Sequence, residues 1–209
     1  MPNLRILHDN AANRVSSLTA NTTSGSLAAA NLLTDRKAEV HRATATSVTY
    51  TAIWTTAELM NMVCLAYTNY TSTATIRVRA YSDSADVSPA VDTGTVLACG
   101  YSPLGLWPWG TVPLGVNAFS YGGGTYARAY FTAGAYEKLV IDIVDVDQPA
   151  AYVEASRLIV GAYWAPEYNP GYGATARVND TTANSRSQSG DLRSDVGTVS
   201  RSLPVDLER

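Results

Sequence analysis

Apolar and polar residues alternate along several short segments of this chain, which is the pattern of half-buried β-strands. The segments are residues 47–54, 62–66, 73–81, 138–146 and 157–163. Clusters of Asn, Asp, Ser and Pro separate them, and such clusters form turns. Short strands punctuated by turns predict an all-β, antiparallel β-sandwich, with Trp54 and Trp164 expected in its core.

Helical periodicity is weak by comparison. The best candidate is the segment 26–37, whose Ala and Leu residues suffice for a turn or two of helix. Residues 181–190 have no apolar face and are predicted to form a loop or linker.

The strand pattern breaks completely between residues 100 and 124. These 25 residues contain no charge, seven glycines and three prolines. Three successive pentads, GYSPL, GLWPW and GTVPL, place a proline at every fifth residue, which excludes a helix or a central strand. A loop of this length inside a compact domain is usually functional.

Trp107, Trp109 and Tyr121 are the candidate contact residues of this loop. Aromatic rings at such a position could insert into another protein, pack on the sandwich itself, or stack on the C–H face of a sugar. Insertion into another protein is the favoured interpretation of the three.

A second change of pattern divides the chain into a sandwich domain at residues 1–168 and an arm at residues 169–209. The arm is rich in Ser, Thr and Asn and carries five charges of each sign. Alternation returns near its end, where the candidate docking residues are Val199, Leu203, Val205 and Leu207. We predict a strand that pairs with another subunit, and the alternative is a terminus folded on its own domain.

Composition narrows the class of partner. Charged residues make up 16% of the chain, against about 25% in an average domain, and Lys37 and Lys138 are its only lysines. A preference for Arg and Tyr over Lys and Glu is typical of interfaces. The net charge of −3 argues against a nucleic-acid partner held by phosphate neutralisation. Without a secretory signal or a long apolar run, no membrane insertion is expected.

The chemistry-bearing residues predict no catalytic site. His8 and His41 stand in no nucleophile motif and are expected to be structural or solvent-facing. The spacing of His, Cys and Asp predicts no metal site, and no phosphate-binding motif indicates a cofactor. Cys64 and Cys99 could form one bridge, but two buried free thiols are favoured. We therefore predict that the protein is not an enzyme.

One predicted strand offers a candidate recognition surface. Arg77, Arg79 and Tyr81 share a face of this strand, where guanidinium groups could bind a carboxylate or stack under a ring. The competing and favoured interpretation is an exposed strand face whose arginines contact aspartates of a neighbouring strand.

Five segments carry a family resemblance: residues 31–33, 39–44, 64–79, 157–166 and 180–203. Together they resemble the galactose-binding-like (discoidin, or F5/8 type C-like) jelly-roll family, in the version found in tail-tip and baseplate proteins of long-tailed bacteriophages. His41 stands where that family has a tryptophan, and the loop at residues 100–124 has no counterpart there.

The resemblance implies a galactose-binding-like jelly-roll β-sandwich in a virion structural protein, assembled in the bacterial host cytoplasm, where free cysteines are expected. It implies a non-enzymatic component of a phage tail tip or baseplate, in a symmetric multi-copy assembly with other virion proteins. The alternative function is a carbohydrate-binding module for host surface glycan, since the same sandwich serves many functions. That module would use Arg77, Arg79, Tyr81 and the loop tryptophans.

Overall fold

The computed structural model describes residues 4–99, 125–167, 177–186, 189, 191–195, 197, 199–202 and 204. Its elements, with η for a 3₁₀ helix, are η1 (Ala11–Arg14), β1 (Ser17–Ala20), η2 (Ala29–Leu33), β2 (His41–Arg42), β3 (Ser47–Thr68), β4 (Thr75–Tyr81), β5 (Val91–Asp92), β6 (Val96–Leu97), β7 (Thr125–Val144), β8 (Glu154–Ala155), β9 (Arg157–Gly161), β10 (Arg177–Asp180), β11 (Ala183–Arg186), β12 (Leu192–Asp195) and β13 (Val199–Ser202). The chain divides into two compact units, Leu7–Tyr163 and Met1–Ile6 with Trp164–Arg209. In the part of the chain described, no helix has the length and apolarity needed to cross a bilayer.

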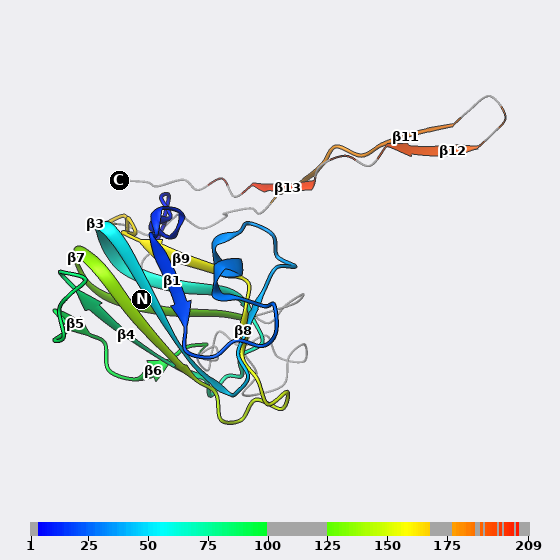
Figure 1. Cartoon of the computed structure of the whole chain (residues 1–209). Helices are drawn as coiled ribbons and strands as arrows, with labels where there is room; N and C mark the ends of the chain where they lie inside the picture. The colour runs from blue at the N-terminus through cyan, green and yellow to red at the C-terminus, as the bar shows by residue number, and fades with distance from the viewer. Residues whose placement is uncertain are drawn as a thin grey trace, which may run out of the picture. The chain divides into compact units, whose positions relative to one another are not determined.

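The unit Leu7–Tyr163 is an antiparallel jelly-roll β-sandwich, which confirms the predicted fold class (Figure 1). Two long strands, β3 and β7, pair with each other and contribute to both sheets. The first half of β3 lies between β1 and the second half of β7, which pairs in turn with β4. The second half of β3 lies between β9 and the first half of β7. A register shift between Ile53 and Glu58 lies between these two halves, and the β3–β7 ladder connects both into one seven-stranded sheet.

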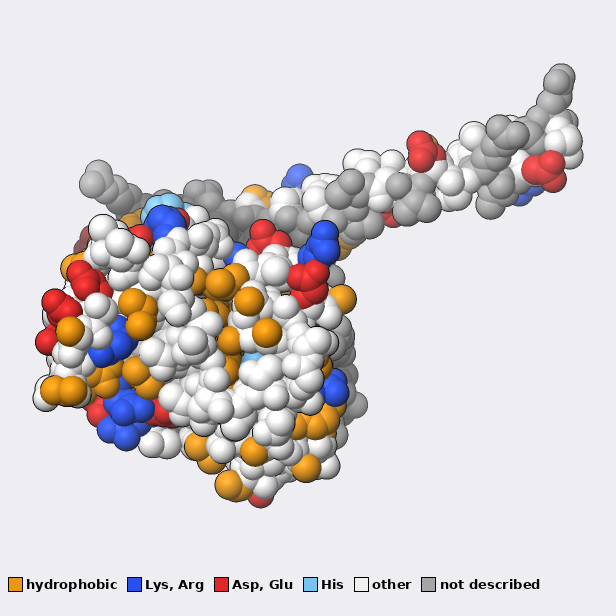
Figure 2. All heavy atoms as spheres, viewed as in Figure 1, with side chains coloured by type: hydrophobic (Ala, Val, Ile, Leu, Met, Phe, Trp, Pro, Cys, Tyr) orange, Lys and Arg blue, Asp and Glu red, His pale blue; other side chains and the backbone are white. Residues whose placement is uncertain are grey.

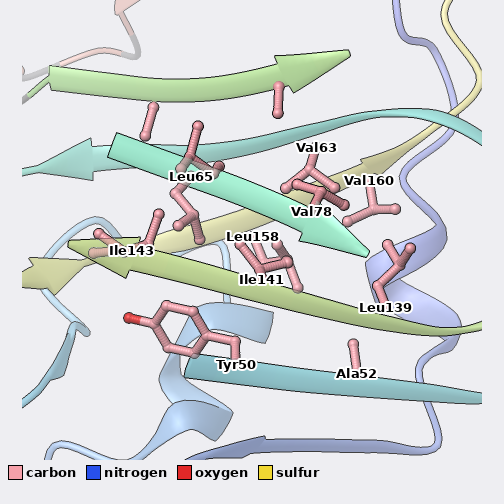
Figure 3. Packing of buried hydrophobic residues seen from close by; sticks show 14 of the residues in the cluster. Tyr50, Ala52, Val63, Leu65, Val78, Leu139, Ile141, Ile143, Leu158 and Val160 are labelled. Atoms are coloured by element: carbon pink, nitrogen blue, oxygen red, sulfur yellow. The ribbon is translucent and has the colours of Figure 1, made fainter. Parts of the chain in front are cut away.

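Alternating side chains from both sheets form the core. One sheet contributes buried residues of β3, β4 and β7, and the other contributes buried residues of β3, β7 and β9. The labelled examples in Figure 3 are Tyr50, Ala52, Val78, Leu139, Ile141 and Ile143 from the first sheet and Val63, Leu65, Leu158 and Val160 from the second. Burial of one such Val, Leu or Ile side chain is worth about 1.5–3 kcal/mol. This layer is therefore the main source of stability for the sandwich.

The two longest strands extend beyond the predicted segments. β3 is one strand of 22 residues. Its exposed middle, residues 55–57 (Thr, Thr and Ala), breaks the alternation and therefore suggested two strands. β7 begins at Thr125, well before the predicted start at residue 138. Its first half turns Ala127 and Ala129 toward the core, and alanine carries too little hydrophobicity to mark a strand.

The predictions for the helix candidate, the two tryptophans and the cysteines were partly right. The helix candidate at residues 26–37 is the short 3₁₀ helix η2. Trp54 is buried, and its indole N–H donates a hydrogen bond to the carbonyl oxygen of Ala11 at 2.8 Å. The prediction for Trp164 was wrong, because this residue is 50% exposed. Cys64 and Cys99 are both buried and unbridged, which confirms the expectation of free thiols.

The C-terminal unit contains a two-stranded ribbon (Figure 1) in which β10 pairs with β13 and β11 pairs with β12. The strand predicted near the chain end is β13, and its partner here is β10 of the same chain. The prediction of a loop at residues 181–190 was wrong, because β11 lies within it. Both faces of β11 are exposed, so its sequence has no apolar alternation to reveal the strand.

Candidate functional site

The guanidinium groups of Arg77 and Arg79 are bound to carboxylates of neighbouring strands. Arg77 Nε donates to Asp92 Oδ1 of β5 at 2.9 Å, and this arginine holds the pKa of the Asp92 carboxyl well below its ordinary value. Arg79 Nη2 donates to Asp142 Oδ2 of β7 at 2.7 Å. Tyr81 is buried, with Lys138 Nζ 4.3 Å from its ring centroid. The two arginines thus contact aspartates of neighbouring strands, as in the favoured interpretation. Tyr81 is buried and is not a surface group.

Tyr67 has an unusual backbone conformation for a tyrosine. Its φ angle is +53°, in the left-handed region that costs a non-glycine residue about 1–2 kcal/mol. The residue lies in a β-bulge, because Ala66 and Tyr67 of β3 stand opposite the single residue Tyr126 of β7. A bulge re-aims side chains, and the Tyr67 side chain is left 36% exposed. Strain of this kind is concentrated at functional sites.

Tyr126 and Lys37 adjoin the strained tyrosine. The ring centroids of Tyr67 and Tyr126 are 5.4 Å apart with the planes inclined at 53°. Lys37 Nζ lies 4.6 Å from the centroid of the Tyr67 ring, a distance at which the ammonium and the ring attract each other. We call these three residues the tyrosine platform. It combines aromatic faces, two phenolic hydroxyl groups and one positive charge.

Ser156 positions the segment that carries Lys37. Its backbone N–H donates to the carbonyl oxygen of Ala66 at 3.1 Å, one residue before Tyr67. Its buried hydroxyl lies 3.0 Å from the carbonyl oxygen of Lys37 and within 3.4 Å of those of Arg36 and Glu39. Ser156 therefore holds the segment that carries Lys37 next to β3, the strand that carries Tyr67.

The loop at residues 100–124 leaves and rejoins the sandwich close to this platform. The backbone N–H of Arg128 donates to the carbonyl oxygen of Ala98 at 3.1 Å, so the two ends of the loop are adjacent. The chain re-enters β7 at Thr125, one residue before Tyr126. The predicted contact residues Trp107, Trp109, Tyr121, Leu203, Val205 and Leu207 lie outside the described residues, and of Val199 only the backbone, in β13, is described.

The buried titratable groups of the sandwich have structural roles. His41 is buried, its Nε2 lies 3.0 Å from the Thr22 carbonyl oxygen, and its Nδ1 lies 2.9 Å from the Tyr50 hydroxyl. We therefore assign the proton to Nε2, and burial lowers the pKa of His41. Burial also raises the pKa of the Cys64 thiol to about 12, so it is not a nucleophile at neutral pH. Within the described ranges, no three His, Cys, Asp or Glu residues are grouped to hold a metal ion.

A cavity of about 230 Å³ is the second candidate site. Arg14 dominates it, donating to Glu58 at 2.7 and 2.9 Å and to Asp9 at 2.8 Å from two nitrogens. The hydrogen bonds from Arg14 hold the pKa of Asp9 below its ordinary value. Leu59 adds an exposed apolar wall. Its carboxylates are bound to Arg14, and no Trp, Tyr or Phe ring lines it. This cavity is therefore less suited to a sugar than the platform.

Solved structures with a similar fold include carbohydrate-binding modules. CBM32-3 from a family 31 glycoside hydrolase from Clostridium perfringens has a TM-score of 0.50 and 10% identity, covering 74% of this chain and 93% of that one. Chitosan-binding module 1 of a chitosanase/glucanase from Paenibacillus sp. IK-5 has a TM-score of 0.47 and 15% identity, covering 74% and 100%. Truncated AlyQ, with CBM32 and alginate lyase domains, has a TM-score of 0.45 and 17% identity; the alignment covers 81% of this chain and only 36% of AlyQ.

These likenesses bear on the fold alone. The CBM32-3 match agrees with the jelly-roll architecture that the family resemblance implied. No protein-family profile matches the chain, and no curated protein matches its sequence. None of the structures named here links the chain to a phage tail.

Sequence reasoning did not single out the residues of the platform. Only their positions in the sequence could have indicated them: Tyr67 directly precedes the Thr68-Asn69 turn, and Tyr126 lies two residues after Gly124, the last glycine of the long loop. The positive φ of Tyr67 has no sequence signature, because tyrosine normally avoids that conformation.

Proposed function

We propose that the sandwich is a non-enzymatic glycan-binding module and that the tyrosine platform contacts the glycan. The observation that carries the proposal is the positive φ of Tyr67, an exposed residue whose strain is not offset by burial. The fold supports it, since the CBM32-3 module has the same architecture. This function was the alternative from the sequence, and the site differs from the one expected there.

The chemistry of the platform suits a sugar. A pyranose offers apolar C–H faces and a rim of hydroxyl groups, so it pairs with an aromatic face next to donors and acceptors. The rings of Tyr67 and Tyr126 are inclined to each other and form a corner that can contact two sides of one sugar ring. The ammonium group of Lys37 favours a glycan that carries a carboxylate.

The test is a glycan array with the full chain, followed by titration calorimetry on any hit. Tyr67→Gly removes the ring while keeping a backbone that adopts positive φ readily. We expect it to weaken binding by about tenfold or more, equivalent to roughly 1.4 kcal/mol. Tyr126→Ala should do the same, whereas Tyr67→Phe, which keeps the aromatic face, should retain most of the affinity.

Two control variants separate the platform from other surfaces. Tyr152→Ala removes a tyrosine whose ring contacts Arg42 instead, and Glu58→Gln alters the Arg14 cavity; both should leave affinity unchanged. If Glu58→Gln abolishes binding and Tyr67→Gly does not, the cavity is the site and the platform is wrong. An array without hits among neutral and acidic glycans would contradict the function itself.

Trp107 and Trp109 stay candidate contact residues, because their loop returns to the sandwich beside Tyr126. The joint variant Trp107→Ala with Trp109→Ala tests them in the same assay. A loss of binding in that variant alone would assign the contact to the loop instead of the platform.

The role in a phage tail tip or baseplate, with virion partners and location, stays a prediction carried by the family resemblance. Its test is the location and copy number of the protein in a particle. Deletion of residues 169–209 should leave a folded sandwich that no longer enters particles, and unchanged incorporation would contradict the docking role of the arm.

A further inference from the structure

The surface that carries the tyrosine platform continues beyond it, over the first half of β7, the second half of β3 and β9. Ala127, Val63 and Leu158 of these strands point into the core, and successive residues of a strand point to opposite faces. The outward positions are therefore Tyr126, Arg128 and Tyr130 of β7, Met62, Cys64 and Ala66 of β3, and Arg157, Ile159 and Gly161 of β9. We call these positions the platform face.

The three outward residues of β7 form a row that starts in the platform. Tyr126 is part of the platform, and Arg128 and Tyr130 follow at every second residue. Along a strand the four steps from Tyr126 to Tyr130 cover about 13 Å, which is longer than a single sugar ring. The Tyr130 ring packs against that of Tyr163, with the centroids 5.5 Å apart and the planes inclined at 83°. One pair of tyrosines therefore stands at each end of the row.

Arg128 lies between the two pairs of tyrosines. It is exposed, and it stands opposite Cys64 in the β3–β7 ladder. Burial raises the pKa of the Cys64 thiol, and the nearby positive charge of Arg128 opposes that rise. The guanidinium group is therefore held over β3, next to the buried Cys64 and Ala66, within the row that the tyrosines define.

The platform face differs in charge from the outer face of β4. The arginines of β4 pair with aspartates, and Figure 2 shows basic and acidic side chains next to one another at the left of the view, where Figure 1 draws β4 and β5. On the platform face, none of the outward positions is an Asp or Glu. Arg128 and Arg157 lie on it, and Lys37 adds a positive charge at the platform end. Arg157 pairs with Asp35, whose side chain is 94% exposed. The platform face is therefore complementary to an anionic ligand.

We propose that the glycan is a linear oligosaccharide of uronic acids that lies along β7 from the platform to Tyr130. One sugar ring contacts Tyr67 and Tyr126, and another contacts Tyr130 through its C–H face. A carboxylate between them binds the Arg128 guanidinium, whose planar fork matches it. This assignment rests on the proposed glycan-binding function and adds the charge, length and direction of the ligand.

A length series tests the charge and extent of the ligand. The probes are linear oligouronates of increasing length, prepared from pectate and from alginate, and the same oligomers after reduction of their carboxylates to alcohols. Each is titrated into the full chain by calorimetry. We expect the affinity to rise by about tenfold or more once an oligomer reaches both pairs of tyrosines. Reduction of the carboxylates should lower it by a similar factor, and added salt should weaken only the acidic oligomers.

The outcomes separate this assignment from glycan binding itself. If single sugars bind as tightly as long oligomers, or reduced oligomers as tightly as acidic ones, the assignment is wrong while glycan binding stands. The same holds if no oligouronate binds but the array gives other hits. An array without any hit would contradict the proposed function as well.

Two variants test the residues beyond the platform. Tyr130→Ala should weaken binding of the long oligomers by about tenfold and leave the shortest bound oligomer unaffected, because that oligomer contacts only the platform. Arg128→Gln should weaken binding of the acidic oligomers and leave that of the reduced ones unchanged. The matched control is Arg77→Gln, which removes an arginine from the outer face of β4 and should bind every oligomer as the wild type does.

Unchanged binding of the shortest oligomer also verifies that Tyr130→Ala is folded. Arg128→Gln alters an exposed residue, so it tests the assignment even if Tyr130→Ala is unstable. The proposed path is wrong if Arg128→Gln keeps the full preference for acidic oligomers. It is equally wrong if a folded Tyr130→Ala chain binds the long oligomers as tightly as the wild type.

Discussion

The sandwich and the ribbon use arginine in opposite ways. In the sandwich, arginines on strands reach carboxylates of neighbouring strands, as Arg79 does with Asp142 and Arg42 with Glu154. In the ribbon, Arg177 and Arg186 form no ion pair with any other described residue. The sandwich arginines thus join neighbouring strands, which Arg177 and Arg186 do not do among the described residues.

Burial divides the two regions in the same way. The sandwich encloses a continuous core, whereas every strand side chain that is described in the ribbon is exposed. The following predictions test this contrast between the two regions, from the largest effect to the smallest.

The largest difference is expected for removal of apolar side chains. Ile141→Ala, in the centre of the core, should lower the free energy of unfolding by about 2–5 kcal/mol, because it leaves a cavity. Val178→Ala in the ribbon, where Val178 is 64% exposed, should change it by less than about 0.5 kcal/mol. Urea denaturation measures both, and equal effects would contradict the division between the two regions.

The sandwich should also lose stability in mild acid through His41. Its pKa in the folded state is lowered by burial, so the unfolded chain binds the proton first. Stability is therefore fully present above pH about 6.5 and falls as the pH is lowered, with a limiting slope of about 1.4 kcal/mol per pH unit.

Denaturation curves at pH 7, 6 and 5 check this effect. The exposed His8 provides the control, since His8→Asn should keep the pH dependence while His41→Asn should remove it. A wild-type chain equally stable at pH 7 and pH 5 would contradict the assigned protonation state.

A smaller effect should reveal the strain at Tyr67. Because glycine adopts positive φ without penalty, Tyr67→Gly should be more stable than Tyr67→Ala by about 1 kcal/mol. At the ordinary strand position Thr51, the order should reverse by about 0.5–1 kcal/mol in favour of alanine. Thermal or urea denaturation of the four variants compares the two orders, and the same order at both positions would argue against strain.

The smallest effect concerns the surface ion pairs. Asp142→Asn removes the charge that binds Arg79 and weakens an acceptor for the Thr49 hydroxyl. Both members of the ion pair are partly solvent-exposed, so the expected loss is about 0.5–1 kcal/mol. Arg186→Gln in the ribbon should leave the free energy of unfolding of the sandwich unchanged. An equal loss of stability in this variant would contradict the difference between the two regions.

Much of the sandwich could be predicted because alternation survives in its most apolar strands. Val48, Tyr50, Ala52 and Trp54 mark their strand through β-propensity and period two. The first half of β7 was missed because alanine fills its inward positions, and β11 because no face of it is buried. Hydrophobic alternation appears in a sequence only where one face of a strand is buried. It therefore does not reveal strands whose side chains are exposed on both faces.

The candidate site was less predictable for a related reason. Arg77 and Arg79 attracted attention as a charged face, yet whether an arginine is free or paired depends on Asp92 and Asp142, which follow 15 and 63 residues later. The platform depends on a bulge and on a lysine delivered by a distant segment. Such juxtapositions arise from tertiary structure and have no local signature.

The sharing of β3 and β7 between both sheets has a consequence for how the sandwich opens. A sandwich whose sheets use separate strands can expose one layer while the other persists. Here neither layer can detach without breaking the β3–β7 ladder that continues into its neighbour. Amide hydrogens of both layers should therefore exchange with solvent through one global opening, at a common slow rate. A load applied to either sheet would be transmitted along these two strands to the other.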